Sequence, residues 1–539
     1  MILPDRLPKW ILPIPVVCAA ALYARFFGGY WLGDDFGNLQ SGLFAAQRGE
    51  TLAQAWAQLF TAVPSEGAFY RPAMSAAVLF NAALAGTRFA GWFAVNFAMH
   101  LANVVLVAIA VATLARACGR DGRLAGVVAA CLFAACPLLA EGVFWISARA
   151  DAAVTLLTLA AMLAWVRARV SVAAACAVPL CVLAALGFKE SAAVFPLQIA
   201  LVAFAWPSRP ARGQIASIVA CFAFVALFFA MRAHLFGDIW HVYPTSAVAS
   251  PDERFRHAIA SLLPWWRGLS RSAPAAGTAY VVALAIAMAT VLLATRGGQR
   301  LLAAALFMAS VGLCAATLMN LGGMNPSGEG GRLAYSPFAW LALALGVASA
   351  KPLVGADRPA TSASRRAGVA ALVAATIIGT FVLERELRDA HAAQDQLHAL
   401  AQATREWAAL HPGLTLLVID GARGAVVTGR NAQGALVLPP IQQEPLLHRM
   451  LPTLPAEIES RYDQLQQGLA TRLDALRPSF VDAGVLQQLA AHDTARWPEH
   501  YGCWSASERR IVELPAPDPA QRRAWADAVR ESAARCKDQ

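Results

Sequence analysis

Charged residues are scarce in this chain. They make up 14% of its 539 residues, whereas a soluble domain carries about 25%. Hydrophobic residues make up 58%, and the mean hydropathy is +0.50. Apolar runs close to the length of a bilayer crossing recur between Trp10 and Val382. This composition excludes a wholly soluble protein and predicts a mainly α, polytopic helical membrane protein.

The motifs of several other protein classes are also missing. The sequence shows no glycine-rich phosphate loop, no nucleic-acid-binding motif and no internal repeat. The net charge is +10, and Lys and Arg retained on the cytoplasmic side of a membrane explain it better than nucleic acid as a partner does. The expected partners are therefore membrane lipid and lipid-linked molecules, and no sugar-nucleotide site is expected.

The ten cysteines have no metal-ligand spacing. Eight of them lie in the apolar part of the chain, where we expect them to be small core residues. Cys503 and Cys536 lie in the polar tail, and we predict a disulfide between them because the tail is expected outside the cytoplasm. Two unpaired thiols are the alternative.

The apolar runs predict about eleven membrane-spanning helices. Their expected ranges are 10–29, 92–115, 124–141, 152–167, 171–187, 191–206, 214–236, 277–295, 300–319, 334–350 and 367–383. Alternate connections carry clusters of Lys and Arg, which marks them as cytoplasmic, and the odd number of crossings places the tail on the other side. The first run lacks a small-residue cleavage site, so we expect a retained helix. The expected location is a bacterial inner membrane with a periplasmic tail.

The composition changes from apolar to mixed charge after Glu384. We therefore predict a membrane domain at 1–383 and a small periplasmic α+β domain at 384–539. A polar helix is expected at 384–410, and helix again over 443–490. Short strands are expected between them at 414–419, 425–428 and 435–438.

Two outer connections are long, 30–91 and 237–276. The first is expected to contain a helix over 41–60 and a short interfacial helix over 73–85. The second contains the pair Trp265-Trp266, which is typical of an interfacial anchor and is also compatible with a lid over a lipid substrate.

Polar residues are distributed unequally between the two sides. The cytoplasmic connections are short and basic, whereas the outer ones hold carboxylates, amides and paired charges, so a functional site is expected on the outer face. The candidate residues there are Asp34, Asp35, Tyr70, Arg71, His100, Asn103, Glu141, Arg149, Asp151, Lys189, Glu190, Arg332 and Tyr335.

Simpler interpretations of these motifs exist. The charged neighbours in Arg149-Ala150-Asp151 and in Lys189-Glu190 are compatible with surface ion pairs that contribute little. His100 and Asn103 share a helix face and are expected to bond another helix, with substrate contact as the alternative. Glu141 at a membrane edge requires a partner, because an isolated carboxylate there is costly.

The motifs follow one another in a distinctive order between about residues 30 and 340. The order is Asp-Asp, Tyr-Arg-Pro, His-x-x-Asn, Pro-x-x-x-Glu, Arg-Ala-Asp, Lys-Glu and Gly-Arg-Leu-x-Tyr-x-Pro. It resembles the C-type (GT-C) membrane glycosyltransferases, most of all the transmembrane O-mannosyltransferases that carry tetratricopeptide repeats and their bacterial relatives. The chain departs from them at Ala148, where the family has glycine, and in having a small tail domain in place of the repeats.

The resemblance implies a polyprenyl-phosphate-linked sugar donor and an acceptor in the outer compartment. It implies that an acidic residue of the first outer loop is catalytic, which is carried over to Asp34 or Asp35, with Asp34 as the expected base. It also implies that Arg332 and Tyr335 lie on the donor side.

The residue types suit such a reaction independently. A carboxylate takes the proton of the acceptor hydroxyl, and arginine binds a leaving phosphate with two parallel hydrogen bonds. A single carboxylate acting as base inverts the anomeric centre. Asp34 and Asp35 are also oxygen ligands that suit Mg²⁺ or Mn²⁺, although the resemblance argues mildly against a metal requirement.

Two other functions remain possible from the sequence. A transporter or flippase of lipid-linked sugars is expected to show internal repeats and ionisable residues at mid-membrane. A membrane scaffold that binds cell-envelope components has no need of the acidic pair.

Overall fold

The chain folds into two compact units. The computed structural model describes residues 13–31, 35, 70–86, 88–236, 274–318, 331–353, 359–410, 416–420, 480–482, 500–505 and 509–514. The first unit comprises Met1–Arg25, Ala53–Ala77 and Trp92–Leu387, and the second comprises Phe26–Leu52, Val78–Gly91 and Arg388–Gln539.

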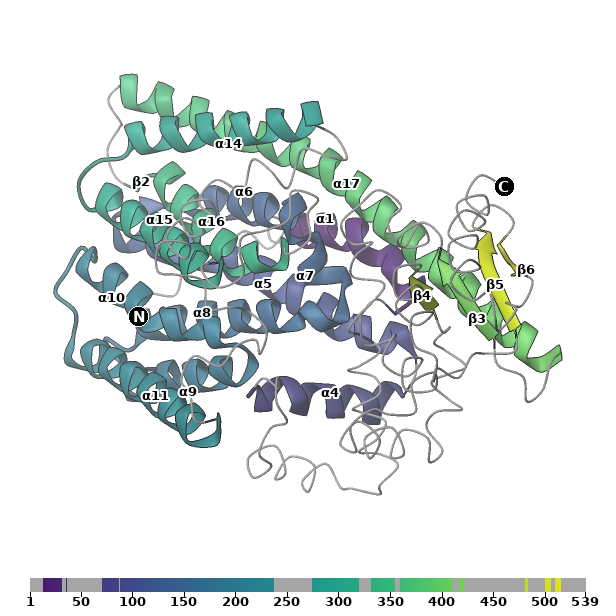
Figure 1. Ribbon diagram of the computed structural model, residues 1–539. Helices are drawn as coiled ribbons and strands as arrows, with labels where there is room; N and C mark the ends of the chain where they lie inside the picture. The colour runs from purple at the N-terminus through teal and green to yellow at the C-terminus, as the bar shows by residue number, and fades with distance from the viewer. Residues whose placement is uncertain are drawn as a thin grey trace, which may run out of the picture. The chain divides into compact units, whose positions relative to one another are not determined.

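The first unit is helical (Figure 1). Helices α4 (Pro72–Ala85), α5 (Phe89–Ala117) and α17 (Pro359–Leu410) continue into the second unit. The other α-helices are α1 (Pro13–Tyr23), α6 (Arg123–Ala134), α7 (Ala140–Phe144), α8 (Arg149–Arg167), α9 (Val172–Phe188), α10 (Phe195–Phe204), α11 (Arg212–Phe236), α14 (Pro274–Ala294), α15 (Gly297–Leu318) and α16 (Tyr335–Ser349). The 3₁₀ turns are η1 (Ala24–Gly28), η2 (Pro137–Leu139), η3 (Ile146–Ala148), η4 (Glu190–Val194) and η5 (Gly331–Ala334).

Six helices in the described part of the chain are long and apolar enough to cross a membrane, or seven if a bent pair counts as one span. Each of the eleven expected ranges contains a helix. Several of these helices are shorter than the usual span of about 20 residues. For example, α9 has 17 residues and α16 has 15. The structure therefore supports a polytopic membrane protein.

Helix α16 lies at the centre of the first unit and is buried over its whole length. It packs against α15, α6, α8 and α14. A helix that is apolar all round is expected in such a position. Helices α11 and α14 instead expose large apolar side chains, among them Phe222, Leu227 and Ile286, as a lipid-facing surface does.

The crossing expected at 124–141 is not one straight helix. Helix α6 ends at Ala134, and the chain continues through η2 into α7 at an angle of 56°. Pro137 lacks a backbone N–H and disfavours helical geometry in Cys136, whose φ of −74° and ψ of 118° are extended. The bend places Glu141 inside a short buried helix instead of at the end of a span.

Helix α17 is continuous over 52 residues. The sequence predicted a crossing at 367–383 and a separate polar helix at 384–410, with a domain boundary between them. That boundary falls inside α17, because residues 384–410 contain neither Gly nor Pro and are rich in Ala, Leu, Gln, Glu and Arg. The helix expected over 73–85 is present as α4.

The second unit contains a four-stranded sheet of order β4-β3-β5-β6. Strand β3 runs parallel to β4 and β5, and β6 is antiparallel to β5. Its strands are β3 (Leu416–Asp420), β4 (Phe480–Asp482), β5 (His500–Ser505) and β6 (Arg510–Leu514). The sequence placed a strand correctly at β3, missed β5 and β6, and was wrong to expect helix at β4.

Several expectations fall outside the described residues. These are the strands at 425–428 and 435–438, the helix at 41–60, the tryptophan pair at 265–266, and one half of the expected disulfide, Cys536. Cys503 lies in β5. Of the eight cysteines of the apolar part, Cys18 and Cys176 are exposed and are therefore not core residues.

A two-stranded ribbon joins two of the basic connections. Strand β1 (Arg120–Asp121) pairs antiparallel with β2 (Lys351–Pro352). The Asp121 carboxylate lies 3.5 Å from the Lys351 amine. Connections that the sequence assigned to the same side of the membrane therefore meet in the fold.

Candidate functional site

Helix α5 positions the start of α8 with two asparagines on one of its faces. Asn96 donates a hydrogen bond to the carbonyl of Trp145 (3.0 Å), and Asn103 donates one to the carbonyl of Ala152 (2.9 Å). All of these groups are buried. These two hydrogen bonds hold residues 145–152 against α5 without any contribution from ion pairs.

The same face of α5 holds the start of α16. His100 Nδ1 lies 2.7 Å from the Tyr335 hydroxyl, which also accepts a longer bond from Asn103 (3.4 Å). The Ser336 hydroxyl lies 2.6 Å from that of Thr155 on α8. The interhelical hydrogen bonds expected of His100 and Asn103 are present, and Tyr335 is their shared partner.

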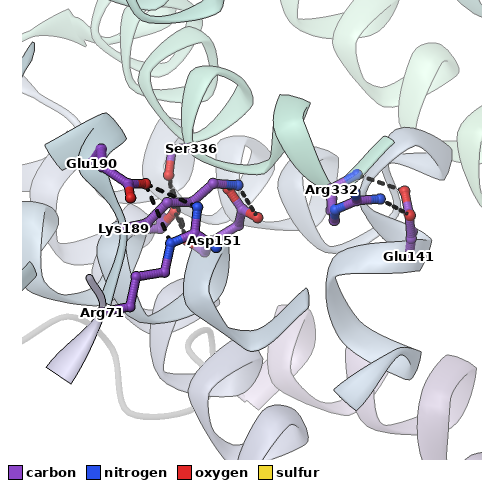
Figure 2. Close-up of polar contacts among 8 residues, drawn as sticks. Arg71, Glu141, Asp151, Lys189, Glu190, Arg332 and Ser336 are labelled. Carbon is purple, nitrogen blue, oxygen red and sulfur yellow. Dashed lines mark hydrogen bonds and ion pairs between the residues drawn. The ribbon is translucent and has the colours of Figure 1, made fainter. Parts of the chain in front are cut away.

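Glu141 and Arg332 form the first of three ion-pair groups. The Glu141 carboxylate accepts hydrogen bonds from the Arg332 guanidinium and from the Arg332 backbone N–H (3.0 Å), as Figure 2 shows. The Arg332 side chain is 26% exposed and that of Glu141 only 1%. The guanidinium carbon lies 4.7 Å from the centre of the Trp145 ring. The partner that Glu141 was expected to need is therefore Arg332.

Two glycines allow α7 and η5 to approach each other this closely. A Cβ at Gly142 would lie 2.7 Å from the Tyr335 ring, and one at Gly331 would lie 2.7 Å from the Leu138 carbonyl oxygen. Side chains larger than hydrogen are excluded at both positions.

Asp151 and Lys189 form the second group. Both Asp151 carboxylate oxygens lie 2.7 Å from the Lys189 amine. The side chains are 5% and 13% exposed. The Asp151 carbonyl also accepts a long bond from Ser336 (3.4 Å), which ties this group to α16 (Figure 2).

Glu190 lies between two arginines in the third group. Arg71 Nη2 approaches one carboxylate oxygen (2.9 Å), and Arg232 Nη1 approaches the other (3.1 Å). Arg71 precedes α4, and Arg232 lies near the end of α11. The Arg232 side chain is 2% exposed, and the Arg71 side chain is 23% exposed.

The three groups act on one another electrostatically. The positive charges of Arg71 and Arg332 both act on Lys189. Burial lowers the pKa of the Lys189 amine, and the facing Asp151 carboxylate opposes that shift. Burial by itself raises the pKa of Glu190, but Arg71 and Arg232 outweigh it, so that the pKa is lowered. Among the described residues, these groups hold four cations and three carboxylates.

Arg149 is fully buried at the start of α8. Its side chain donates hydrogen bonds to the carbonyls of Ile146 (3.3 Å) and Trp92 (3.4 Å), and its guanidinium carbon lies 5.5 Å from the centre of the Trp92 ring. These contacts hold η3 against α5. Arg149 therefore has a packing role besides any contact with substrate.

The ion pairs suggested by sequence neighbours are wrong. Asp151 pairs with Lys189 and not with Arg149, and Glu190 pairs with Arg71 and not with Lys189. Neighbouring residues at the start of a helix point in different directions, so each charged side chain pairs with a residue from another segment of the chain. The pairs are also buried or half-buried, not surface pairs.

Tyr70 and the acidic residues complete the candidate set. Tyr70 is buried, its ring lies 6.1 Å from that of Phe228, and burial raises the pKa of its hydroxyl. Asp34 lies outside the described residues. Asp35 is fully buried and belongs to the second unit. Among the described residues no group of three His, Cys, Asp or Glu side chains is arranged to hold a metal.

Sequence reasoning missed Arg232, Asn96 and Thr155. An ionisable residue inside an apolar segment is a functional candidate by default, and this signal could have identified Arg232. Asn96 precedes His100 by one helical turn, so it was identifiable as part of the same face. Thr155 carries no comparable signal, because its role depends on the approach of Ser336.

The chain matches no protein-family model and no curated protein. Its function is therefore inferred from the chemistry of its own residues.

Proposed function

We propose that the protein is a membrane glycosyltransferase. It moves a sugar, a mannose-like hexose or a similar one, from a polyprenyl-phosphate donor to a hydroxyl of a protein, lipid or glycan acceptor. The observation that supports this is the convergence of motifs far apart in sequence into linked ion-pair groups whose described residues include four cations. An anion held at membrane level, such as a lipid phosphate, is the ligand that such a site favours.

Arg332 is the residue best suited to contact the phosphate. Its guanidinium is partly exposed, whereas the carboxylate that orients it is buried. The Trp145 ring lies 4.7 Å from the guanidinium carbon, and the planar fork of N–H donors that arginine carries is the group that suits phosphate oxygens. Lys189 and Arg71 add positive charge nearby.

The reaction is a single displacement at the anomeric carbon. The acceptor hydroxyl gives its proton to a carboxylate of the first outer loop, Asp34 by preference, and its oxygen forms the new glycosidic bond. The bond between the anomeric carbon and the phosphate oxygen breaks, and polyprenyl phosphate leaves with its negative charge held by the cations. One displacement inverts the configuration.

The reaction is tested with purified protein and polyprenyl-phosphate hexoses in detergent. Release of polyprenyl phosphate together with a glycosylated acceptor supports the proposal. A flippase or a scaffold binds the donor without cleaving it, so binding without release across a panel of hexose donors contradicts the enzyme.

The topology that goes with this function has eleven crossings, a cytoplasmic N-terminus and a periplasmic tail in a bacterial inner membrane. The basic connections support it, and the contact between β1 and β2 joins two of them. A reporter that is active only in the periplasm, fused after Gln539, is expected to be active. Activity of a cytoplasmic reporter at that position would place the tail on the wrong side for the mechanism.

Donor use is expected to depend on Arg332. Arg332→Lys keeps the charge but loses the planar fork, and it is expected to raise the KM for the donor about tenfold. Arg332→Ala is expected to raise it more and to lower the melting temperature, because Glu141 then stays buried without its guanidinium partner. Both are measured by transfer kinetics and thermal melting in detergent.

Two further variants separate binding from stability. Arg169→Lys changes an exposed arginine that bonds Ser208 and the Arg209 carbonyl, and it serves as the matched control. Arg332→Ala combined with Glu141→Gln is expected to recover stability without recovering donor use. Unchanged donor KM in both single Arg332 variants means that another residue holds the phosphate.

A further inference from the structure

The segment that leads into the acidic stretch packs along α17 within the second unit. The Phe26 ring lies 5.7 Å from that of His391, and the Tyr30 ring stacks on that of His398 at 4.8 Å with an interplanar angle of 10°. Both pairs advance in the same direction along the chain, so the segment runs alongside the helix.

Between these ring pairs the two backbones approach closely. A Cβ on Gly29 would collide with the side-chain oxygen of Gln394 and lie 3.0 Å from its Cδ. Gln394 is fully buried, and neither polar atom of its amide has a hydrogen-bond partner among the described residues. A buried amide without hydrogen-bond partners is disfavoured, and the Gly29 backbone is one of the groups that it packs against.

The α17 residues in this contact lie on one face. His391, Gln394 and His398 are three and four residues apart, which is the spacing of neighbours on a helix surface. Asp395 adds an ion-pair contact to His391 Nδ1 at 3.1 Å, which fixes that ring. We refer to His391, Gln394 and His398 as the α17 docking face.

Packing at the other end of the segment is equally tight. Trp31 is 1% exposed and meets the Phe89 ring edge-on at 5.4 Å, and Asp35 is fully buried. The four residue steps from Trp31 to Asp35 span at most about 14 Å when extended. Fixing Trp31 therefore limits where Asp35 can lie.

We propose that the α17 docking face positions the acidic stretch for catalysis. His391, Gln394 and His398 are positioning residues: they hold Phe26, Gly29 and Tyr30, and through these residues the backbone that carries Asp35. The inference rests on the proposed glycosyl transfer. It gives the polar half of α17, beyond the crossing expected at 367–383, a positioning role in the reaction.

The inference predicts an effect on turnover and not on donor binding. The cations proposed to bind the phosphate belong to the first unit, whereas every docking contact lies in the second. A displaced acid lowers kcat, because misplacing a reacting group by about 1 Å can cost up to about 10²-fold. A merely structural contact lowers the melting temperature and leaves kcat of the folded protein unchanged.

Two adjacent glycines provide the matched test. A Cβ at Gly28 would have no other atom within 4 Å, whereas one at Gly29 meets Gln394. In the full-length protein, Gly29→Ala is expected to lower kcat about tenfold with an unchanged donor KM, and Gly28→Ala is expected to behave as wild type. Gln394→Ala combined with Gly29→Ala removes the collision with Gln394 but leaves the added Cβ 3.1 Å from the Phe26 carbonyl oxygen, so it is expected to restore part of the turnover.

A second measurement tests the contact without using activity. Tyr30→Cys and His398→Cys, introduced together, are treated with a short bis-methanethiosulfonate reagent, and mass spectrometry is expected to find the peptide linked through positions 30 and 398. If wild type transfers no sugar, the proposed function fails, whereas the cross-link still reports the packing. If wild type is active and Gly29→Ala matches Gly28→Ala, or if Gln394→Ala does not restore turnover, the positioning inference is overturned.

Discussion

Replacing both Asp34 and Asp35 with Asn is expected to lower sugar transfer about 10²-fold or more in a folded protein. Asn keeps the size of Asp and much of its hydrogen bonding, but it does not take up the acceptor's proton. Asp34→Asn alone is expected to lose nearly as much. Asp35→Asn is expected to lose less, because Asp35 is fully buried and a base must reach the acceptor hydroxyl. Turnover at saturating donor is the measurement.

Donor binding and thermal melting are measured on the same variants, and both are expected to stay near wild type. Asp121→Asn is the matched control, since Asp121 pairs with Lys351 away from the candidate site. If a divalent cation bridges the acids, both single variants lose activity and added Mn²⁺ changes the rate. If the double variant melts like wild type and keeps full activity, neither Asp34 nor Asp35 is the catalytic base.

The sequence identified most of the residues of the charged site but not their pairing. Their order and chemical types are visible along the chain, because ionisable residues stand out among apolar segments. Glu141 and Arg332, however, are 191 residues apart, and their contact depends on how η5 meets α7. That contact requires Gly142 to lie against the Tyr335 ring and Gly331 to lie against the Leu138 carbonyl, and no local sequence pattern predicts either approach.

Helix positions followed from apolar runs more reliably than helix lengths did. The bend at Pro137 was predictable from the missing N–H, yet an apolar run on both sides of it resembled one span. Helix α17 is the opposite case, because a change of solvent from lipid to water alters composition without ending a helix. The boundary predicted after residue 383 lies inside this helix, and the two compact units also divide inside it, between Leu387 and Arg388.

Arg232 illustrates what tertiary structure adds to the site. In sequence it is one cation near the end of an apolar helix that mostly faces outward. In the fold it is buried against Glu190, which Arg71 also contacts. Its charge therefore belongs to the same ion-pair group as Glu190 and Arg71, a contact that its place in the sequence does not show.

Lys189→Met is expected to destabilise the protein by about 3–5 kcal/mol, because it leaves the buried Asp151 carboxylate without its partner. Lys189→Met combined with Asp151→Leu removes both charges and is expected to recover most of this loss, as apolar replacements of buried pairs often do. Thermal melting in detergent measures both variants, and Arg169→Met, at an exposed arginine, is the control.

The same pair of variants separates folding from function. If Lys189 contributes positive charge at the donor phosphate, the double variant melts near wild type but keeps a raised donor KM, because a methionine and a leucine restore packing and not charge. If the double variant recovers stability and donor KM together, the pair is a structural contact between α8 and the turn after α9, and the phosphate is held by Arg332 and Arg71 without it. Melting of the double variant as low as that of Lys189→Met would mean that the ion pair itself stabilises the fold, contrary to the expected cost of burying two charges.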